Sequence, residues 1–579
     1  MRITVSKSKK AESFYITHSY VNKQGKSTST TYKKLGSLAD LKKQLGTDSR
    51  DEVMAWCQEQ CRIETEKYKK ENEVVLVSLS PNKLIEKDKP RTFNCGYLFL
   101  QDIYYQLRFD NIVRNISSRH KFEYSLDSIL SDLVYARILN PSSKQSSYEY
   151  CKNLLEAPKY ELHDVYRALS VLAEESDYIQ SELYKNSQFI HNRDKSVLYY
   201  DCTNYYFEIE EEDELRKYGK SKENRPNPIV GMGMFMDSDG IPLAFDIYPG
   251  NQNEQKTLKP LEKKIIKDFD CSNFIYCSDS GLGSLNNRKF NSMGGRAYVI
   301  TQSLKKLKKE DRDIALDPTG WKVPGGKKPI DLRELDETSP AVIDTVYYKE
   351  VNLETDALPD QSLIVTYSVK YKKYQAAIRE GQIQRARKMI ESGSKIKKTH
   401  RNPNDPARFI SKTSVTESGE VADKEFYAFD ENKVKEEAMY DGFYAVVTDL
   451  LDDPAQIIEV NKRRWQIEEC FRIMKTEFKS RPVYLSLHDR IKAHFLTCFI
   501  SLVVYRLLEI KLGNNYTCDK TISTLRGMNV TEIEGYGYIP SYTRTELTDK
   551  LHDLAGFRTD TQIIKKLKMR NIIKKSKEK

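Results

Sequence analysis

The spacing of hydrophobic and polar positions changes along the 579-residue chain. Residues 3 to 35 alternate between apolar and polar and contain turn residues, which predicts a small hairpin-like unit, and residues 38 to 70 have helical spacing. From residue 97 to 186, apolar residues recur at intervals of three and four, in pieces separated by proline-containing breaks. We therefore expect a small α+β unit over residues 1–80 and a helical region over residues 93–190.

A segment rich in strands follows. Residues 197–207 predict an apolar, aromatic strand, and residues 229–248 predict a hairpin around an Asp-Ser-Asp-Gly turn. Two further strands, at residues 274–278 and 297–301, are each preceded by a helical segment. Three antiparallel strands followed by parallel crossovers favour an α/β fold, a mixed sheet flanked by helices of the ribonuclease-H type.

A long insertion interrupts this sheet. Residues 304–440 begin with a lysine-rich run and contain strand-like pieces and a basic helix, before an apolar strand at 442–448. The end of the chain is rich in lysine. We expect a core in two parts, residues 191–303 and 441–515, separated by the insertion domain and followed by a basic C-terminal tail at 516–579.

The segment from Asn461 to Lys475 predicts a helix with two distinct faces. At about 100° per residue, a narrow stripe carries Asn461, Arg464, Glu468, Arg472 and Lys475, beside an apolar stripe. One carboxylate therefore lies among three cations at the border of a buried face. This arrangement suits a site that binds a metal and a polyanion; the alternative is a solvated helix stabilised by i,i+4 ion pairs.

Two more carboxylates have informative surroundings. Asp201 lies in the middle of an aromatic strand, where burying an unpaired carboxylate is costly or shifts its pKa, unless the strand is an edge strand facing water. Asp279 ends a strand, where ligands collect in α/β folds, although a turn or capping role is the alternative. Together with Glu468, these carboxylates could converge on two Mg²⁺ ions about 3.5–4 Å apart. Hard oxygen ligands without a His or Cys cluster favour Mg²⁺ or Mn²⁺ over Zn²⁺.

The overall composition of the chain says less about its function than the positions of its charged residues do. The chain has 94 basic and 84 acidic residues and a net charge of +10, which fits nucleic acid or an anionic surface but also an ordinary soluble protein. The apolar run 493–510 contains His494 and Arg506 and predicts a buried helix, not a membrane span. Ten scattered cysteines and an N-terminus without a signal-peptide pattern favour reduced thiols and a cytoplasmic location.

Several ordered motifs resemble the DDE transposases of bacterial insertion sequences, in the group marked by a Tyr-x2-Arg-x3-Glu-x6-Lys signature. Arg464, Glu468 and Lys475 match that spacing, while Asn461 occupies the Tyr position. The residues around Asp201 and Asp279 resemble the first and second Asp blocks. The resemblance extends over about residues 190 to 510, and its other motifs lie at residues 219–226, 239–243, 249–251, 481–484 and 490–494.

The resemblance implies a ribonuclease-H-like catalytic domain interrupted by a mostly β insertion. Asp201, Asp279 and Glu468 would be the catalytic residues and the ligands of two Mg²⁺ ions, with Mn²⁺ as a substitute. Arg464 and Lys475 would hold DNA phosphates. The expected reaction is cut-and-paste or related transposition of double-stranded DNA, from terminal inverted repeats into target DNA, by a homodimer on DNA. Asn461 leaves open whether a hairpin intermediate forms.

Other residues are candidates for DNA contact. Arg472 lies on the charged stripe, Arg225 lies in a Gly/Lys/Pro loop that could equally be solvated, and Trp465 could stack on an unpaired base or pack in the core. Trp321 could be a base-flipping wedge, and His494 is expected to be a packed, hydrogen-bonded histidine. Two other functions remain open: a catalytically silent DNA-binding protein derived from a transposase, and a stand-alone ribonuclease-H-fold nuclease.

Overall fold

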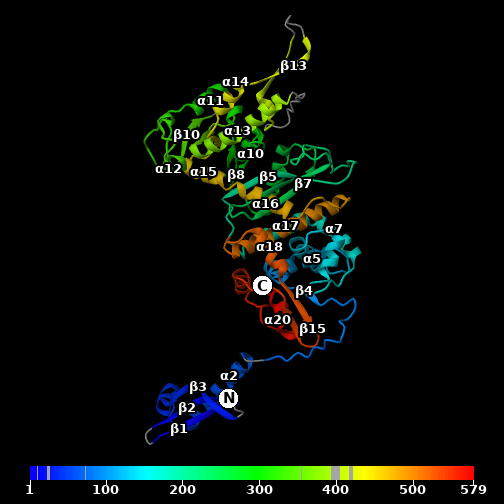
Figure 1. Cartoon of the computed structure of the whole chain (residues 1–579), viewed down its shortest axis with the longest axis vertical. Coiled ribbons are helices and arrows are strands. Elements are labelled where there is room, and N and C mark those ends of the chain that lie inside the picture. The colour runs from blue at the N-terminus through cyan, green and yellow to red at the C-terminus, as the bar shows by residue number, and fades with distance from the viewer. Residues whose placement is uncertain are drawn as a thin grey trace. The chain divides into compact units, whose positions relative to one another are not determined.

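The chain forms two compact units, Met1–Lys89 and Pro90–Lys579 (Figure 1). The computed structural model describes residues 1–8, 11–21, 26–71, 74–353, 355–392, 404–415 and 421–578.

The first unit is a three-stranded antiparallel sheet with two helices. Its elements are β1 (Arg2–Lys7), β2 (Glu12–Val21), β3 (Ser27–Ser37), α1 (Leu38–Leu45) and α2 (Arg50–Glu71). Phe14 of β2 is fully buried against Leu41, Val53 and Cys57 of the helices. The alternating pattern of the strands thus gives one apolar face, which the helices cover.

The second unit begins with a helical region. Its helices are α3 (Tyr97–Gln106), α4 (Phe109–Arg119), α5 (Leu126–Leu139), α6 (Lys144–Cys151), α7 (Leu162–Glu174) and α8 (Ser176–Ser187). The long helix α17 (His488–Lys511) packs against α3, α5 and α7 on one side and against β7 (Pro242–Pro249) on the other (Figure 1). By length and composition α17 could span a membrane, but 89% of its apolar window is buried inside the protein. The predicted buried helix at residues 493–510 is therefore confirmed.

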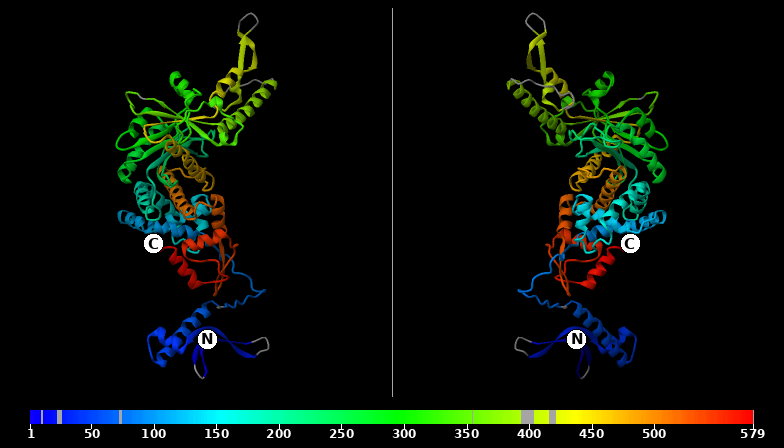
Figure 2. Two further views of the ribbon diagram at one scale, coloured as in Figure 1. Left: turned by 90° about the vertical axis from the view of Figure 1, so that its left-hand side faces the viewer. Right: turned by 90° about the vertical axis from the view of Figure 1, so that its right-hand side faces the viewer.

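The central layer of this unit is an eight-stranded mixed sheet with the order β10-β11-β14-β9-β8-β5-β6-β7, seen from two further sides in Figure 2. Its other strands are β5 (Val197–Tyr206), β6 (Ile229–Met236), β8 (Ile275–Ser278), β9 (Ala297–Thr301), β10 (Val346–Asn352), β11 (Ser362–Ser368) and β14 (Phe443–Thr448). Strands β5, β6 and β7 are antiparallel, and β8 and β9 run parallel to β5. The helices between them are α9 (Leu258–Asp268) and α10 (Leu285–Asn291). The prediction of a mixed α/β sheet flanked by helices is confirmed.

The predicted hairpin is closed by its own side chains. The Asp237 carboxylate accepts hydrogen bonds from the backbone N–H of Asp239 (3.1 Å) and Ile241 (2.9 Å). Gly240 has φ of +78°, and a Cβ there would lie 2.4 Å from the Arg506 guanidinium of α17. Because no other residue combines that backbone conformation with that close approach, glycine is required at this turn.

The insertion is mixed and not mostly β as predicted. It contains α11 (Lys309–Leu316), α12 (Pro340–Asp344), α13 (Val369–Glu391), α14 (Glu431–Ala438) and the strand pair β12 (Ile410–Val415) and β13 (Val421–Phe429). Its strands β10 and β11 belong to the main sheet, where Leu363 and Val365 are fully buried. The apolar strands of this segment extend the core sheet because β14 offers them an edge to pair with.

The predicted basic tail is folded. It forms α18 (Cys518–Gly527), β15 (Asn529–Ile533), β16 (Gly537–Pro540), α19 (Glu546–Ala555), β17 (Ile564–Lys565) and α20 (Lys566–Lys575). The three strands make a sheet with β4 (Thr92–Asn94). Ile564, Met569 and Ile572 are buried, so apolar positions between the lysines anchor this segment.

Candidate active site

Asp201 and Asp279 come from neighbouring parallel strands. Tyr199 of β5 pairs with Cys277 of β8; Asp201 lies two residues further along β5, and Asp279 directly follows the last residue of β8. Burial raises the pKa of the Asp201 carboxyl to about 6; Asp279 adds to this rise, whereas Lys222 and Arg464 oppose it. The two carboxylates therefore interact electrostatically. Strand β5 is paired on both sides, so the alternative of an edge strand facing water is wrong.

Asp279 also organises the turn after its strand. Its Oδ1 accepts hydrogen bonds from the backbone N–H of Gly281 (3.0 Å) and Leu282 (3.2 Å). The turn alternative thus describes one real role of this side chain, whereas the helix that follows is capped by Ser284. Proximity to Asp201 is a second property of the same carboxylate.

The charged segment is two helices, α15 (Pro454–Lys462) and α16 (Trp465–Thr476), and not the single helix predicted. Between them the backbone N–H groups of Arg464, Gln466 and Ile467 each bond to the carbonyl three residues back, at 3.1–3.2 Å. This tighter turn changes the angle between residues on either side of it. Asn461 lies in α15, before this turn, and its side chain donates to the Tyr444 hydroxyl (3.1 Å).

Arg464 connects Glu468 to the aspartates. Its guanidinium lies 3.1 Å from the Glu468 carboxylate and interacts electrostatically with Asp201. Glu468 itself is exposed. Within the part of the chain that the structure describes, no three His, Cys, Asp or Glu side chains are grouped closely enough to hold a metal ion. The structure thus brings Asp201 and Asp279 together, and the convergence of Glu468 on them stays a prediction.

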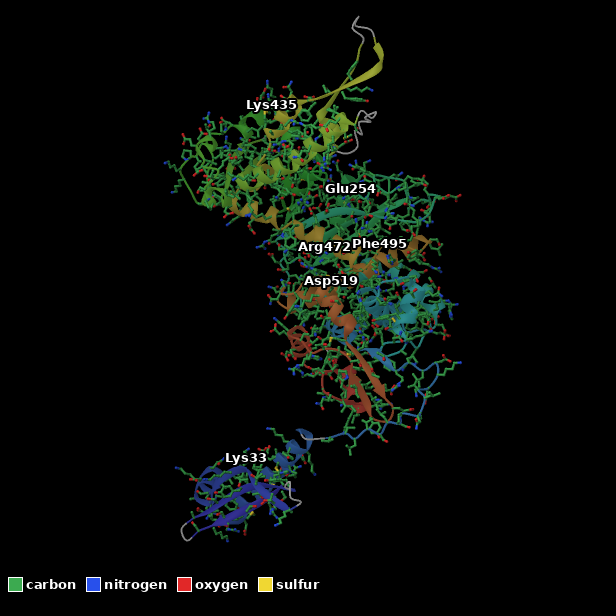
Figure 3. All side chains as sticks on the ribbon, viewed as in Figure 1. Lys33, Glu254, Lys435, Arg472, Phe495 and Asp519 are labelled. Carbon is green, nitrogen blue, oxygen red and sulfur yellow. The ribbon has the colours of Figure 1, made fainter. Side chains whose placement is uncertain are left out.

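Lysines complete the cationic surroundings. The Lys475 ammonium donates to the Thr203 hydroxyl (2.6 Å) and lies 3.5 Å from Glu223; burial and Lys222 lower its pKa to about 8. Lys222, which no local pattern in the sequence marks, donates to the carbonyl of Cys202 and interacts with both aspartates. It lies 3.5 Å from Glu254, which is labelled in Figure 3. The only signal for it was its place in the motif at residues 219–226.

Comparison with known proteins places this core in a family. A family model described as a transposase DDE domain matches residues 200–504, which is 305 of the 579 residues and spans Asp201, Asp279 and Glu468. The chain belongs to this family of transposases. No curated protein matches it. A solved structure, the cryo-EM structure of a piggyBac transposase synaptic complex with hairpin DNA, aligns at 10% identity and a TM-score of 0.33, over 83% of this chain and 84% of that one.

Three of the transposase's predicted DNA contacts lie on the surface. Arg472, labelled in Figure 3, pairs with Glu469 (3.2 Å). Arg225 is exposed, and its guanidinium lies 4.8 Å from the centre of the Tyr206 ring. Trp465 is 57% exposed, so the core-packing alternative is wrong for this side chain. All three remain candidates for contact with DNA.

Trp321 and His494 are both buried in the transposase. The Trp321 indole N–H donates to the carbonyl of Asp317 (2.8 Å), and its side chain is fully covered, so the wedge hypothesis is wrong. His494 makes a 3.1 Å hydrogen bond with the carbonyl of Ser480, which confirms its prediction as a packed histidine.

Proposed function

We propose that this transposase binds the terminal inverted repeats of its own element, cleaves a strand at each end and transfers the ends to target DNA. The observation that carries the proposal is the pair Asp201 and Asp279 within the matched domain, surrounded by Lys222, Arg464 and Lys475. Carboxylates suit a cation, and the surrounding cations suit phosphates. The strand order and crossovers support the ribonuclease-H-like interpretation of the core.

The chemistry of the donor set fits a divalent metal at the aspartate pair. Two interacting carboxylates supply hard oxygen ligands, and a cation between them would relieve the repulsion that helps raise the pKa of Asp201. Glu468 would complete the set of metal ligands once its ion pair with Arg464 is broken and its carboxylate is free to bind the cation. Bound Mg²⁺ or Mn²⁺, in a two-ion site, would stabilise charge on the attacking and leaving oxygens.

The chain's own residues would position the substrate. Arg464 and Lys475 would contact phosphates beside the scissile bond, Arg464 through two N–H groups and Lys475 as a point charge. Thr203 holds the Lys475 ammonium in place from the same strand as Asp201. Water would break the P–O3′ bond at the element end, leaving a 5′-phosphate and a free 3′-hydroxyl. This hydroxyl would then attack a target phosphorus, forming a new phosphodiester as the target P–O3′ bond breaks and a target 3′-hydroxyl leaves.

The partners follow from the reaction. Two element ends must be cut together, so we expect a homodimer assembled on DNA. The same substrate would place the protein in the cytoplasm, on the nucleoid. Lys222 would offset the negative charge of the aspartate pair until the substrate and cation bind.

The direct test uses the purified full-length chain with DNA that carries the sequences flanking its gene. With Mg²⁺ we expect strand nicks at the element end. Asp201→Ala, Asp279→Ala and Glu468→Ala should each lower the cutting rate at least about a hundredfold, since metal stabilisation contributes several kcal/mol. Gel-shift binding of the same DNA should change little.

Glu469→Ala is the matched control, because Glu469 neighbours Glu468 and pairs with Arg472. Normal cutting by Glu468→Ala together with loss of cutting by Glu469→Ala would show that the register on α16 is wrong. If the wild type binds ends but never cuts with Mg²⁺ or Mn²⁺, the protein is the silent DNA-binding alternative. Cutting without end preference would favour the stand-alone nuclease.

A further inference from the structure

A second cationic pocket lies outside the candidate active site. It has a volume of about 200 Å³ and is formed by α5, the start of α6, the segment after α16, and α17. Arg137, Lys144 and His494 are its buried lining residues, and Lys479 and Arg481 are nearer to the surface. No carboxylate is among the described residues that line it.

Arg137 is only partly satisfied. Its side chain is 3% exposed, and two of its nitrogens donate to the carbonyls of Phe478 (3.1 Å) and Ser142 (3.0 Å). Its Nε has no acceptor among the described residues. A buried guanidinium with a free donor and no counterion is costly, because both its charge and its N–H group have left water.

The buried ammonium of Lys144 has even fewer compensating contacts than the Arg137 guanidinium. It is 5% exposed, and in the described part of the chain its ammonium has neither a hydrogen-bond acceptor nor a carboxylate partner. Burial first, and Arg137 second, lower its pKa to about 7. His494 adds no further positive charge, since burial and the two cations hold its pKa well below its usual value.

The local backbone favours an anion as well. Lys144 is the first residue of α6, whose N-terminus is capped by the side chain of Ser143. The free N–H groups and dipole of a helix N-terminus attract negative charge. Here this feature adds to two buried cations that face the same cavity.

We infer that this pocket binds a phosphate-type oxyanion, held by Arg137 and Lys144. An anion would supply a counterion for the buried Arg137 and Lys144 side chains and an acceptor for the Lys144 ammonium. Both requirements are met by one tetrahedral group, and a cavity of about 200 Å³ has room for it.

The surroundings suggest where the phosphate comes from. Arg481, on the wall of the pocket, pairs with Glu223, which lies 3.5 Å from Lys475 of the candidate active site. Cations therefore continue from the aspartate pair to the pocket, as expected along a DNA backbone. This DNA source rests on the proposed function, whereas binding of an oxyanion by the pocket does not.

The first experiment measures thermal unfolding of the full-length protein in inorganic phosphate and in chloride at equal ionic strength. The wild-type melting temperature should rise with phosphate. Measured below about pH 7, where Lys144 is charged, Lys144→Met should raise it without phosphate, because an unpaired buried charge is gone, and should lose the phosphate response. Lys185→Met, an exposed lysine on α8, is the control and should keep the response.

No phosphate response in the wild type, or a full response in Lys144→Met, would overturn the inference. If Lys144→Met does not fold, calorimetric titration of the wild type with phosphate decides the question, and absence of saturable binding rejects the pocket.

The second experiment identifies the source of the anion. For a short DNA duplex, Lys144→Met should reduce the slope of log K against log salt by about 1 if the pocket takes a backbone phosphate. An unchanged slope with a lost phosphate response would assign the pocket to a free anion. A protein that never cuts DNA but keeps the phosphate response would refute the proposed function and leave the pocket standing.

Discussion

Arg464 is the residue on which the candidate active site depends most. It lies in the turn between α15 and α16, at 3.1 Å from Glu468, and interacts with Asp201. It therefore interacts with both Glu468 and Asp201, the proposed third and first carboxylates of the site. Under the proposed function, we expect movement of this side chain toward a DNA phosphate to free Glu468 from its ion pair, which would couple substrate binding to completion of the site.

Trp465, next to Arg464, gives a prediction at the same scale. Trp465→Ala should weaken binding of DNA with an unpaired end by about 1–3 kcal/mol, because an exposed indole stacks on unstacked bases. Its melting temperature should stay near that of the wild type, since the side chain is 57% exposed. Fluorescence anisotropy measures the affinity, and Leu451→Ala, which truncates a more exposed apolar side chain, is the control.

Unchanged affinity of Trp465→Ala would remove this residue from the DNA contacts. Equal losses in Trp465→Ala and Leu451→Ala would point to a non-specific effect of removing apolar surface.

The sequence predicts a single site residue where one strand determines the position of that residue. The aromatic run around Asp201 and the strand end at Asp279 sufficed to mark both aspartates, and parallel pairing of β5 and β8 then brings them together. The place of Glu468 was not predictable, because it depends on the tight turn at Arg464. Lys222 was missed because it comes from a loop, whose position no periodicity encodes.

At the scale of elements, α5 shows which structural features the spacing of apolar residues predicts and which it does not. All its residues from Ile129 to Leu139 are buried, because α17 and other helices surround it. The spacing predicts the helix, but not which polar side chains point inward. Asp132 is one of these, and its carboxylate accepts a 2.7 Å hydrogen bond from the Tyr160 hydroxyl.

Asp132 should give the protein a distinctive dependence of stability on pH. Burial raises its pKa to about 7, so between about pH 4 and pH 7 the folded state keeps a proton that the unfolded state has lost. Stability from this group is present below that window and is lost as pH rises through it. Asp132→Asn should therefore gain stability relative to the wild type on going from pH 4 to pH 8, by no more than about 4 kcal/mol.

Urea unfolding at both pH values measures this difference. Asp519→Asn, at an exposed aspartate labelled in Figure 3, is the control for charge removal. If the stability difference between Asp132→Asn and the wild type is the same at both pH values, Asp132 ionises in the folded state as it does in the unfolded chain.

At the scale of the whole molecule, chain segments far apart in sequence share one sheet. Strand β4, near the start of the second unit, pairs with β15 more than 400 residues later. The Asn94 side chain donates to the carbonyls of Leu525 (3.0 Å) and Arg526 (3.1 Å). Such non-local pairing leaves no signal in local patterns, which is why the lysine-rich end was predicted as a tail.

The pairing of β4 with β15 determines which N-terminal truncations should leave the second unit stable. A fragment of residues 90–579 should unfold cooperatively at the melting temperature of the second unit in the full-length protein, because it contains all of that unit. A fragment of residues 97–579 lacks β4 and Asn94 and should melt several degrees lower, since it exposes the edge of β15 and leaves the end of α18 uncapped. Differential scanning calorimetry compares the two, with Asn94→Ala in the longer fragment as the intermediate case. Equal melting temperatures of the two fragments would mean that β4 contributes nothing to the stability of the second unit. If fragment 90–579 already melts far below the full-length protein, the second unit needs the first in order to fold.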